Sequence, residues 1–249
     1  MMKVWIVLML ATLAGAGGDA PTPVIVELFT SEGCSSCPPA DALLMQLGKA
    51  QPVPGARILV LEEHVDYCNQ QGWVDPFSSS EFTARQQRYS ESLRIDGVYT
   101  PQMVVDGRVG FVGSDAGRAR AAIAQASRER KAAVLVTASL EGGNVRLKVS
   151  VENLVFPAGD GAEVLLAITE SNLRSSVGAG ENAGRNLAHS GVVRRLIRVG
   201  TLKPQEAFSA ESTVTIAKGW KRENLQAVVF VQERSSRRVL GAGAAALTE

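Results

Sequence analysis

The hydrophobic residues of the first half of the chain follow two alternating patterns. Residues 24–29 and 58–61 are nearly continuously apolar, which predicts two strands buried on both faces. Between them, apolar residues recur three and four positions apart, which predicts a helix with one buried stripe. That stripe consists of Ala40, Leu43, Leu44 and Leu47. The segment therefore predicts a strand–helix–strand unit.

A second helix, a hairpin and a third helix are expected next. Ser78 and Glu81 have the spacing of a capping box, so the second helix should begin there and end before Gly97. Asp106-Gly107 separates two short apolar runs, as the turn of a β-hairpin does. A third helix should begin near Ser114-Asp115. The order βαβαββα predicts an α/β domain with helices packed on a mixed sheet.

Beyond residue 131 the helical pattern gives way to short alternating runs separated by turn residues. The expected strands cover residues 133–140, 145–151, 164–169, 192–199, 213–217, 227–231 and 239–242. Short strands without a convincing helix predict an all-β, sandwich-like domain. A boundary near Arg130-Lys131 would divide the chain into domains 20–131 and 132–249. The polar stretch Ser171–Ser190 is expected to be a loop.

The N-terminus has the layout of a secretory signal peptide. Lys3 precedes the apolar run Val4–Leu13, and the small residues Ala14-Gly15-Ala16 follow as an A-x-A cleavage site. The run is too short to span a bilayer comfortably. We expect residues 1–19 to form the signal segment, so that the mature protein lies in the periplasm or is secreted, with no membrane span. An uncleaved anchor is the alternative.

Composition narrows the classes of function. The 26 Lys and Arg residues nearly balance the 25 Asp and Glu residues, so the charge predicts no binding to nucleic acid. Three cysteines in 249 residues are too few for a disulfide-stapled scaffold. In an oxidising compartment, an odd number leaves one thiol unpaired if the other two form a disulfide.

The strongest chemical signal is Cys34-Ser35-Ser36-Cys37, between a predicted buried strand and a predicted amphipathic helix. Two sulfurs three residues apart in a first helical turn can approach bonding distance, and the helix N-terminus stabilises a thiolate. Cys34 would then attack a disulfide and Cys37 would resolve the mixed disulfide that results.

Three other interpretations of the pair compete with this one. The two cysteines could be half of a zinc site, but such a site needs further ligands. The chain has no second cysteine pair and only two histidines, His64 and His189. An inert structural disulfide would close so short a loop that it removes little chain entropy. Delivery of a metal by the two thiolates is a weaker option, since no methionine or histidine stands beside the pair. A redox-active dithiol without a cofactor or a bound metal is preferred.

The motifs around these cysteines resemble a known family. They read ELFTSEGCSSCPPAD from Glu27, HVDY from His64, GWxDPF from Gly72 and ENxGR from Glu181, with VVR from Val192. Together with a Thr-Pro pair that opens a later strand, they resemble the thioredoxin superfamily. More closely, they resemble the exported bacterial thioredoxin-like proteins known as DUF1223, over nearly the whole mature chain.

The resemblance implies a thioredoxin-like fold for the first domain and a thiol–disulfide role, without a known substrate. By position, Pro101 would be a cis-proline facing Cys34 and Cys37, and the backbone of Thr100 would pair with an extended substrate segment. A trans proline at the start of an edge strand is the alternative. The expected partner is a protein or a small-molecule thiol or disulfide.

Two features depart from better-known thioredoxins. Pro38-Pro39 follows the second cysteine, and a residue before proline avoids helical geometry, so the helix would begin after Cys37 and help Cys34 less. Residues 24–48 also contain three carboxylates and no Lys or Arg. Such carboxylates would raise the pKa of a nearby thiol. They are Glu27, Glu32 and Asp41.

Single residues near the dithiol carry weaker hypotheses. His64 follows a strand that should lie beside the first one. One interpretation is that it shuttles protons for the dithiol. The preferred interpretation is a loop histidine that is hydrogen-bonded to the backbone or to Asp66. Cys68 would pack as a small apolar residue, or act as a third redox thiol. Trp73 and Phe77 are expected to be core anchors.

Four polar residues gather late in the chain, and their role is open. They would bind a ligand, dock the predicted loop onto the first domain, or form a solvated loop. They are Glu181, Asn182, Arg185 and His189. The preferred function is an exported thiol–disulfide oxidoreductase. The competing function is a non-catalytic binding or assembly module with a structural Cys34–Cys37 disulfide.

Overall fold

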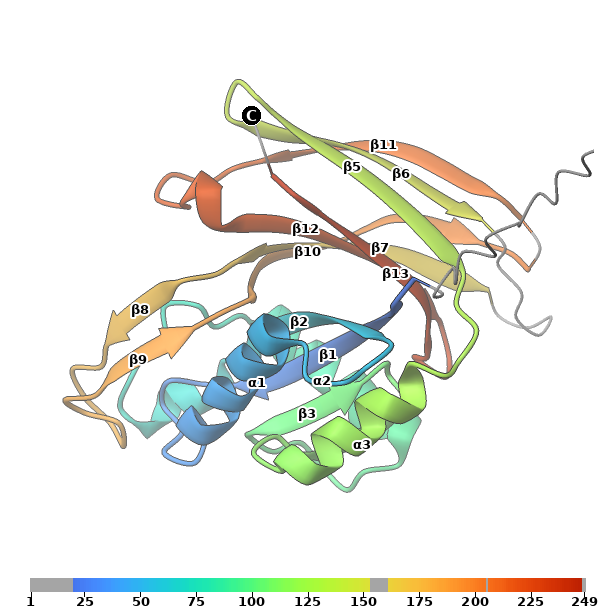
Figure 1. The fold of residues 1–249 in the computed structure, drawn as a ribbon. Helices are drawn as coiled ribbons and strands as arrows, with labels where there is room; N and C mark the ends of the chain where they lie inside the picture. Colours follow the sequence, from blue (N-terminus) through green and yellow to red (C-terminus); the bar gives the residue numbers. More distant parts are fainter. Residues whose placement is uncertain (1–19, 153–160, 205, 248–249) are drawn as a thin grey trace, which may run out of the picture.

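The computed structural model describes residues 20–152, 161–204 and 206–247. These residues form an eight-stranded mixed sheet, a three-stranded antiparallel sheet and a two-stranded sheet (Figure 1). The predicted mixed sheet with α-helices is confirmed, but the sheet is larger than expected because strands of the second half of the chain join it. The predicted signal peptide, residues 1–19, lies outside the described residues.

The first half of the chain contributes four strands and three α-helices, in the predicted order. They are β1 (Thr22–Thr30), α1 (Pro38–Ala50), β2 (Ala56–His64), α2 (Ser80–Leu93), β3 (Gln102–Val105), β4 (Val109–Val112) and α3 (Ala116–Ala126), with a 3-10 helix η1 (Tyr67–Gln71). Strands β1 and β2 are parallel, whereas β3 is antiparallel to β1 and β4 is antiparallel to β3.

Local sequence signals explain where several of these elements begin or turn. The side chain of Ser79 accepts the backbone N–H of Glu81 and caps α2, so the expected start at Ser78 is wrong by one residue. Asp115 caps α3 by accepting the N–H three residues further on. Both residues of the Asp106-Gly107 turn have positive φ, as a type I′ hairpin turn requires.

The described residues of the second half contribute nine strands. They are β5 (Ala133–Glu141), β6 (Asn144–Glu152), β7 (Ala162–Glu170), β8 (Leu173–Ser176), β9 (Asn186–His189), β10 (Val192–Leu202), β11 (Phe208–Thr215), β12 (Leu225–Glu233) and β13 (Val239–Ala246), with a 3-10 helix η2 (Arg222–Asn224). The prediction that Ser171–Ser190 is a loop is wrong, because β8 and β9 pair there as an antiparallel hairpin. Strands of four residues are too short to show a clear alternating pattern.

The large sheet contains strands from both halves of the chain. Its order is β13-β12-β7-β10-β2-β1-β3-β4, and the halves meet where β10 pairs with β2 through Val192 and Glu62. The three-stranded sheet, in the order β11-β6-β5, packs on β7 and β12 and gives that end two layers of strands. The change of pattern at residue 131 is real, since α3 ends before it and β5 begins after it, but it does not interrupt the sheet.

Alternating side chains build a different core on each face of the large sheet. Val24, Val26 and Leu28 of β1 pack with α1 and α3 on one face. Ile25, on the other face, shares a core with Phe82 of α2 and with residues of β7, β10 and β12. Helices on both faces leave the carboxyl ends of β1 and β2 as the place where polar residues gather.

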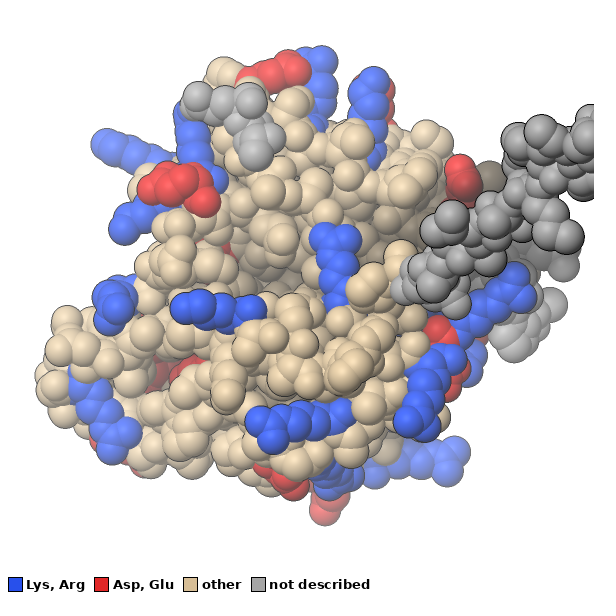
Figure 2. Space-filling view, viewed as in Figure 1, with Lys and Arg blue, Asp and Glu red and all other residues tan. Residues whose placement is uncertain are grey.

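The surface offers no concentrated charge on the face seen in Figure 2. There, Lys and Arg side chains stand apart from one another, with Asp and Glu among them. Within the described residues, no helix combines the length and the apolar character needed to cross a membrane.

Candidate functional site

The two cysteines lie in the turn that joins β1 to α1. Helix α1 begins at Pro38 with Cys37 as its N-cap residue, so the helix begins after Cys37, as expected. Cys37 nevertheless has helical angles, φ −77° and ψ −39°, although a proline follows it. The N–H of Cys37 donates to the C=O of Cys34 at 3.2 Å, which closes the turn. This turn therefore places both cysteines directly before the first residue of α1.

The sulfurs of Cys34 and Cys37 are close neighbours but are not bonded. Their Sγ atoms are 2.6 Å apart, longer than the 2.03–2.05 Å of a disulfide, and both residues are free thiols. Cys34 is 6% exposed and Cys37 is 0% exposed. The exposed Ser35 and Ser36 stand beside Cys34. Cys34 is thus the sulfur nearer to solvent, although it is more covered than an open nucleophile would be.

The surroundings of the two thiols push their pKa values in opposite directions. The Cys37 thiol, then the Ser36 hydroxyl and Thr100, stabilise the Cys34 thiolate against the cost of burial and lower its pKa from 9.0 to about 5. The expectation that carboxylates raise the pKa of a nearby thiol is wrong for Cys34, whose pKa these groups lower, but holds for Cys37, whose pKa Asp41 raises. Burial, the Cys34 sulfur and Asp41 raise the pKa of Cys37. Cys34 is therefore the thiol that ionises first.

A buried acid stands on the far side of Cys37. Asp41, in the first turn of α1, is 4% exposed, and burial raises its pKa to about 7. The hydroxyl of Thr30 donates to Asp41 Oδ1 at 2.6 Å. The same hydroxyl favours the thiolate form of Cys37. Thr30 therefore connects the buried thiol to a carboxylate that titrates near neutral pH.

The Thr100–Pro101 peptide bond is cis, as the resemblance implied. The Sγ of Cys34 lies 3.8 Å from the C=O of Thr100, so this segment faces the dithiol. The Thr100 hydroxyl is also 3.6 Å from the Sγ of Cys68. Cys68 is 2% exposed, and burial raises its pKa. Cys68 thus packs in the same small core as the other two cysteines, which fits its interpretation as an apolar residue.

The β8–β9 hairpin docks onto the dithiol turn. The amide of Asn182 is 1% exposed and donates to the C=O of Glu32 at 2.8 Å and to that of Cys34 at 2.9 Å. Glu181 accepts the N–H of Ser35 at 3.0 Å. Of the interpretations left open for these residues, docking onto the first domain agrees with these contacts. Arg185 is exposed and does not share them.

A second group of buried polar residues lies at the carboxyl end of β2, and we refer to it as the histidine–carboxylate cluster. It consists of Glu32, Glu62, His64, Asp75 and His189. His64 is the last residue of β2, not a loop residue, and its Nδ1 lies 2.7 Å from Asp75 rather than against Asp66, so the preferred interpretation of His64 is wrong. The Nδ1 of His189 lies 2.7 Å from Glu62. Every member is buried.

The carboxylates of this cluster favour protonated histidines. Burial opposes the charge of His64, but Asp75 and Glu62 outweigh it and raise its pKa well above 6.5. For His189 burial is likewise outweighed, by Glu32 and Glu62, and its pKa rises to about 9. In return, the histidines lower the pKa of Glu62 despite its burial. The positive charges of the histidines and the negative charges of the carboxylates therefore stabilise one another.

Two aromatic residues support the cluster from the side. Trp73 donates its indole N–H to Glu32 Oε2 at 2.7 Å. The ring of Phe77 packs edge-on against His64 and His189, with centroid distances of 5.3 and 5.7 Å. Both aromatics are half-buried and pack beside this polar cluster, whereas anchors of a hydrophobic core were expected.

Sequence reasoning missed Glu62, Asp75 and the convergence of the two histidines. Glu62 and His64 are two residues apart, and on a strand that spacing puts both side chains on the same face. This was the one available local signal. Nothing in the sequence placed His189 beside them, because it arrives on the hairpin that was predicted to be a loop.

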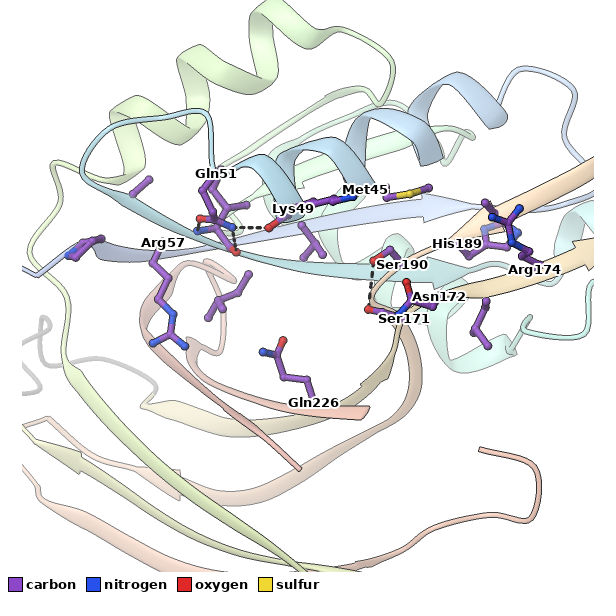
Figure 3. A pocket seen from close by; sticks show the side chains of 18 residues that line it. Met45, Lys49, Gln51, Arg57, Ser171, Asn172, Arg174, His189, Ser190 and Gln226 are labelled. Atoms are coloured by element: carbon purple, nitrogen blue, oxygen red, sulfur yellow. Dashed lines mark hydrogen bonds between the residues drawn. The ribbon is translucent and has the colours of Figure 1, made fainter. Parts of the chain in front are cut away.

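A cavity of about 820 Å³ opens beside the cluster, between α1, β2 and the β8–β9 hairpin. Lys49, Arg57 and Arg174 line it, and Figure 3 shows His189 at one end, next to Arg174. None of the three cysteines lines it. The cavity therefore reaches the histidine–carboxylate cluster rather than the dithiol.

Fold and site together define a mixed α/β protein with a buried, unbonded dithiol beside a cluster of charged residues. The sequence matches the family described as "Protein of unknown function (DUF1223)" over residues 25–232, and the chain belongs to this family. No curated protein matches it.

Two solved structures share the architecture. Protein AGR_C_4864 from Agrobacterium tumefaciens has a TM-score of 0.65 and 26% identity, covering 93% of this chain and 97% of that chain. HBP35 of Porphyromonas gingivalis has a TM-score of 0.63 and 13% identity, covering 92% of this chain and 76% of that chain. The latter likeness shows the fold alone.

Proposed function

We propose that this protein is an exported thiol–disulfide oxidoreductase that works through Cys34 and Cys37. The observation that carries the proposal is the division of labour between the two sulfurs: one ionises readily near the surface, and the other is protonated and buried 2.6 Å away. An asymmetric pair of this kind suits a nucleophilic and a resolving thiol.

We also propose that β1, α1, β2, α2, β3, β4 and α3 form a thioredoxin-like unit, and that the remaining strands form a sandwich-like one. The local strand order β2-β1-β3-β4, with one parallel and two antiparallel pairings, supports the first assignment. The cis bond before Pro101, which faces Cys34 through Thr100, supports it further.

In the first step the Cys34 thiolate attacks one sulfur of a partner disulfide. A new S–S bond joins Cys34 to that sulfur, the old S–S bond breaks, and its electron pair leaves on the second sulfur as a thiolate. The partner is a protein or a small-molecule disulfide. An extended partner segment would lie against the backbone of Thr100, in the manner of an added strand.

In the second step Cys37 resolves the mixed disulfide. Its proton passes through the Thr30 hydroxyl to Asp41, whose pKa of about 7 suits a proton acceptor near neutral pH. The Cys37 thiolate then attacks Cys34, releases the partner as a thiolate and leaves a Cys34–Cys37 disulfide. The partner gains two electrons, and an external dithiol must return two electrons to the pair.

The competing function is a binding or assembly module that keeps the fold but does not exchange thiols. The observation that favours it is the 6% exposure of Cys34, which leaves little surface for an incoming disulfide. The 2.6 Å gap between the sulfurs gives no support to a permanent bridge.

Trapping separates these two functions. Cys37→Ser removes the resolving thiol, so mixed disulfides should accumulate on Cys34 in extracts of the native compartment and be identified by mass spectrometry under non-reducing conditions. Cys34→Ser is the control and should trap nothing. Cys68→Ser, which changes an equally buried thiol, should leave trapping by the Cys37→Ser variant intact.

A redox titration adds a test that needs no partner. In defined thiol buffers, the Cys34–Cys37 couple should show a potential above about −300 mV, the range of exchangeable disulfides. The absence of adducts together with a lower potential would favour the non-catalytic module.

A further inference from the structure

Three side chains of the histidine–carboxylate cluster converge on one point. Glu62 and His64 lie two residues apart on β2, and His189 ends β9. One ligand atom from each can be chosen so that all three lie within 4.8 Å of one another. Their exposures are 1%, 0% and 2%. These residues lie outside the dithiol and take part in no bond-forming or bond-breaking step of the proposed exchange reaction.

The cluster contains buried polar atoms without partners. Within the described residues, the Nε2 atoms of His64 and His189 and the Oε1 atom of Glu32 have no hydrogen-bond partner. Buried polar side chains in native proteins nearly always have one, so each exception requires an explanation. Three of the seven such atoms among the described residues gather in this cluster, the others being on Glu63, Gln102 and Asn182, and His189 Nε2 lies only 3.3 Å from Glu32 Oε1.

The outer contacts orient His64 as they do in metal sites. Its Nδ1 lies 2.7 Å from Asp75 Oδ2, and Asp75 is held in turn by the backbone N–H groups of Glu32 and Phe77. A metal ion that displaces the proton from Nε2 leaves Nδ1–H donated to the carboxylate, and this arrangement fixes metal-binding histidines in many proteins. The unpartnered Nε2 of His64 is therefore the atom that a cation would use.

The distances suit a small cation. Bonds of 2.0–2.2 Å in tetrahedral geometry place ligand atoms about 3.3–3.6 Å apart. The Oε1 of Glu62 is 3.6 Å from the Nε2 of His64 and 2.7 Å from the Nδ1 of His189. The first distance already fits, and the second is a hydrogen bond that a metal would replace by a small turn of the imidazole ring.

We propose that Glu62, His64 and His189 bind a divalent transition-metal ion, with Zn²⁺ as the representative of that class. Two imidazoles and one carboxylate are ligands that Zn²⁺ and its neighbours prefer, whereas Ca²⁺ and Mg²⁺ take oxygen ligands. The ion would enter from the 820 Å³ cavity, whose wall includes His189 (Figure 3). This site is separate from the cysteines, and it stands whether or not they exchange disulfides.

The test begins with the mature wild-type protein, stripped with a chelator and kept reduced. Co²⁺ should bind at one equivalent and give visible d–d bands without the intense charge-transfer band that thiolate ligands produce. Zn²⁺ should displace it, as measured by loss of the d–d bands. A thiolate charge-transfer band at the first equivalent would place the metal on the cysteines and overturn the proposal, as would the absence of binding.

A protein with Cys34, Cys37 and Cys68 all changed to serine repeats the measurement without thiols. It should bind Zn²⁺ as tightly as wild type in isothermal calorimetry. Because this protein cannot exchange disulfides, a negative result here would count against the metal site alone, whereas the trapping experiment tests the exchange reaction alone.

Neighbouring glutamates provide matched variants. Glu62→Gln should lose stoichiometric Zn²⁺, whereas Glu63→Gln should keep it, because Glu63 points to the other face of β2 and lies against Arg85. Asp75→Asn should weaken binding about 10–100-fold, through the orientation of His64. Circular dichroism of each metal-free variant checks folding. Equal Zn²⁺ affinity in the Glu62→Gln and Glu63→Gln variants would refute the assignment.

Discussion

The dithiol and the histidine–carboxylate cluster occupy the carboxyl ends of neighbouring strands, and both are buried, yet they satisfy charge in different ways. The Cys34 thiolate has donors from Cys37 and Ser36 already in place, so this site holds a negative charge with the protein's own groups. In the cluster, the two Nε2 atoms face carboxylates without a hydrogen bond. One site is complete by itself, and the other is completed by an added cation.

The two sites also share connections. The amide of Asn182 bonds the C=O groups of Glu32, which belongs to the cluster, and of Cys34. The charges of Glu62 and His189 act on the pKa of Asp41, the carboxylate next to Cys37. Substitutions that affect one site and spare the other, and one that reaches both, therefore test whether the two sites differ in this way.

The largest effect is expected from Thr30→Val. This change keeps the shape of the side chain but removes the hydroxyl between Cys37 and Asp41, so resolution of a mixed disulfide should slow about 100-fold, the usual contribution of a positioned proton acceptor. Formation of the mixed disulfide should keep its rate, because the groups that lower the pKa of Cys34 are Cys37, Ser36 and Thr100, and all three are unchanged. Single-turnover kinetics with mass-spectrometric detection separates the two steps.

Thr83→Val is the matched control, because Thr83 also donates to a carboxylate, that of Asp66, but away from the dithiol. It should leave both steps unchanged. If Thr30→Val resolved the mixed disulfide at the wild-type rate, the route through Thr30 to Asp41 would have to be abandoned.

The difference between the sites also explains what the sequence could reveal. The dithiol is carried by a contiguous segment, and the strand before it and the helix after it both have strong periodic patterns, so Cys34 and Cys37 could be located directly. The cis bond at Pro101 followed only from family resemblance, since composition does not encode it. The lowered pKa of Cys34 could not be predicted, because Thr100, one of the groups that lower it, lies 66 residues away.

The histidine–carboxylate cluster depends on pairings that no local pattern records. Glu62 and His189 are 127 residues apart, and they meet because β10 joins β2 and the β8–β9 hairpin folds over α1. Two short strands with mostly polar residues gave no periodic signal for that hairpin. The sequence did not predict that one large sheet includes both halves of the chain. In that sheet β2 and β10 are paired at one position only, Glu62 with Val192.

The next largest effect is expected from Asn182→Ala, which acts on both sites at once. It removes two hydrogen bonds to buried carbonyl groups and should lower the free energy of unfolding by about 1–3 kcal/mol. Asn186→Ala, at an exposed position of the same hairpin, should change it by less than about 0.5 kcal/mol. Urea denaturation of both variants measures the difference; equal stabilities would mean that the hairpin is not held through Asn182.

The smallest effect concerns the pKa of Cys34. Ultraviolet absorbance of the thiolate in the reduced protein should titrate near pH 5, so the thiolate persists at neutral pH, where an ordinary cysteine with a pKa of 9.0 is protonated. Ser36→Ala removes the hydroxyl 3.2 Å from the sulfur and should raise this pKa. The rise should leave it below 9.0, since the Cys37 donor contributes more. Ser35→Ala, whose hydroxyl is not bonded to the sulfur, should not shift it.

The same shift has a consequence for stability with a definite sign. Between pH 5 and 9 the unfolded chain holds a proton on Cys34 that the folded protein lacks. The free energy of unfolding of the reduced wild type, relative to Cys34→Ser, should therefore increase with pH across that window and be lost as the pH falls through about 5. If the difference did not change with pH, Cys34 would titrate as an ordinary thiol. The claim that the protein's own groups stabilise a thiolate at the dithiol, without an added cation, would then be refuted.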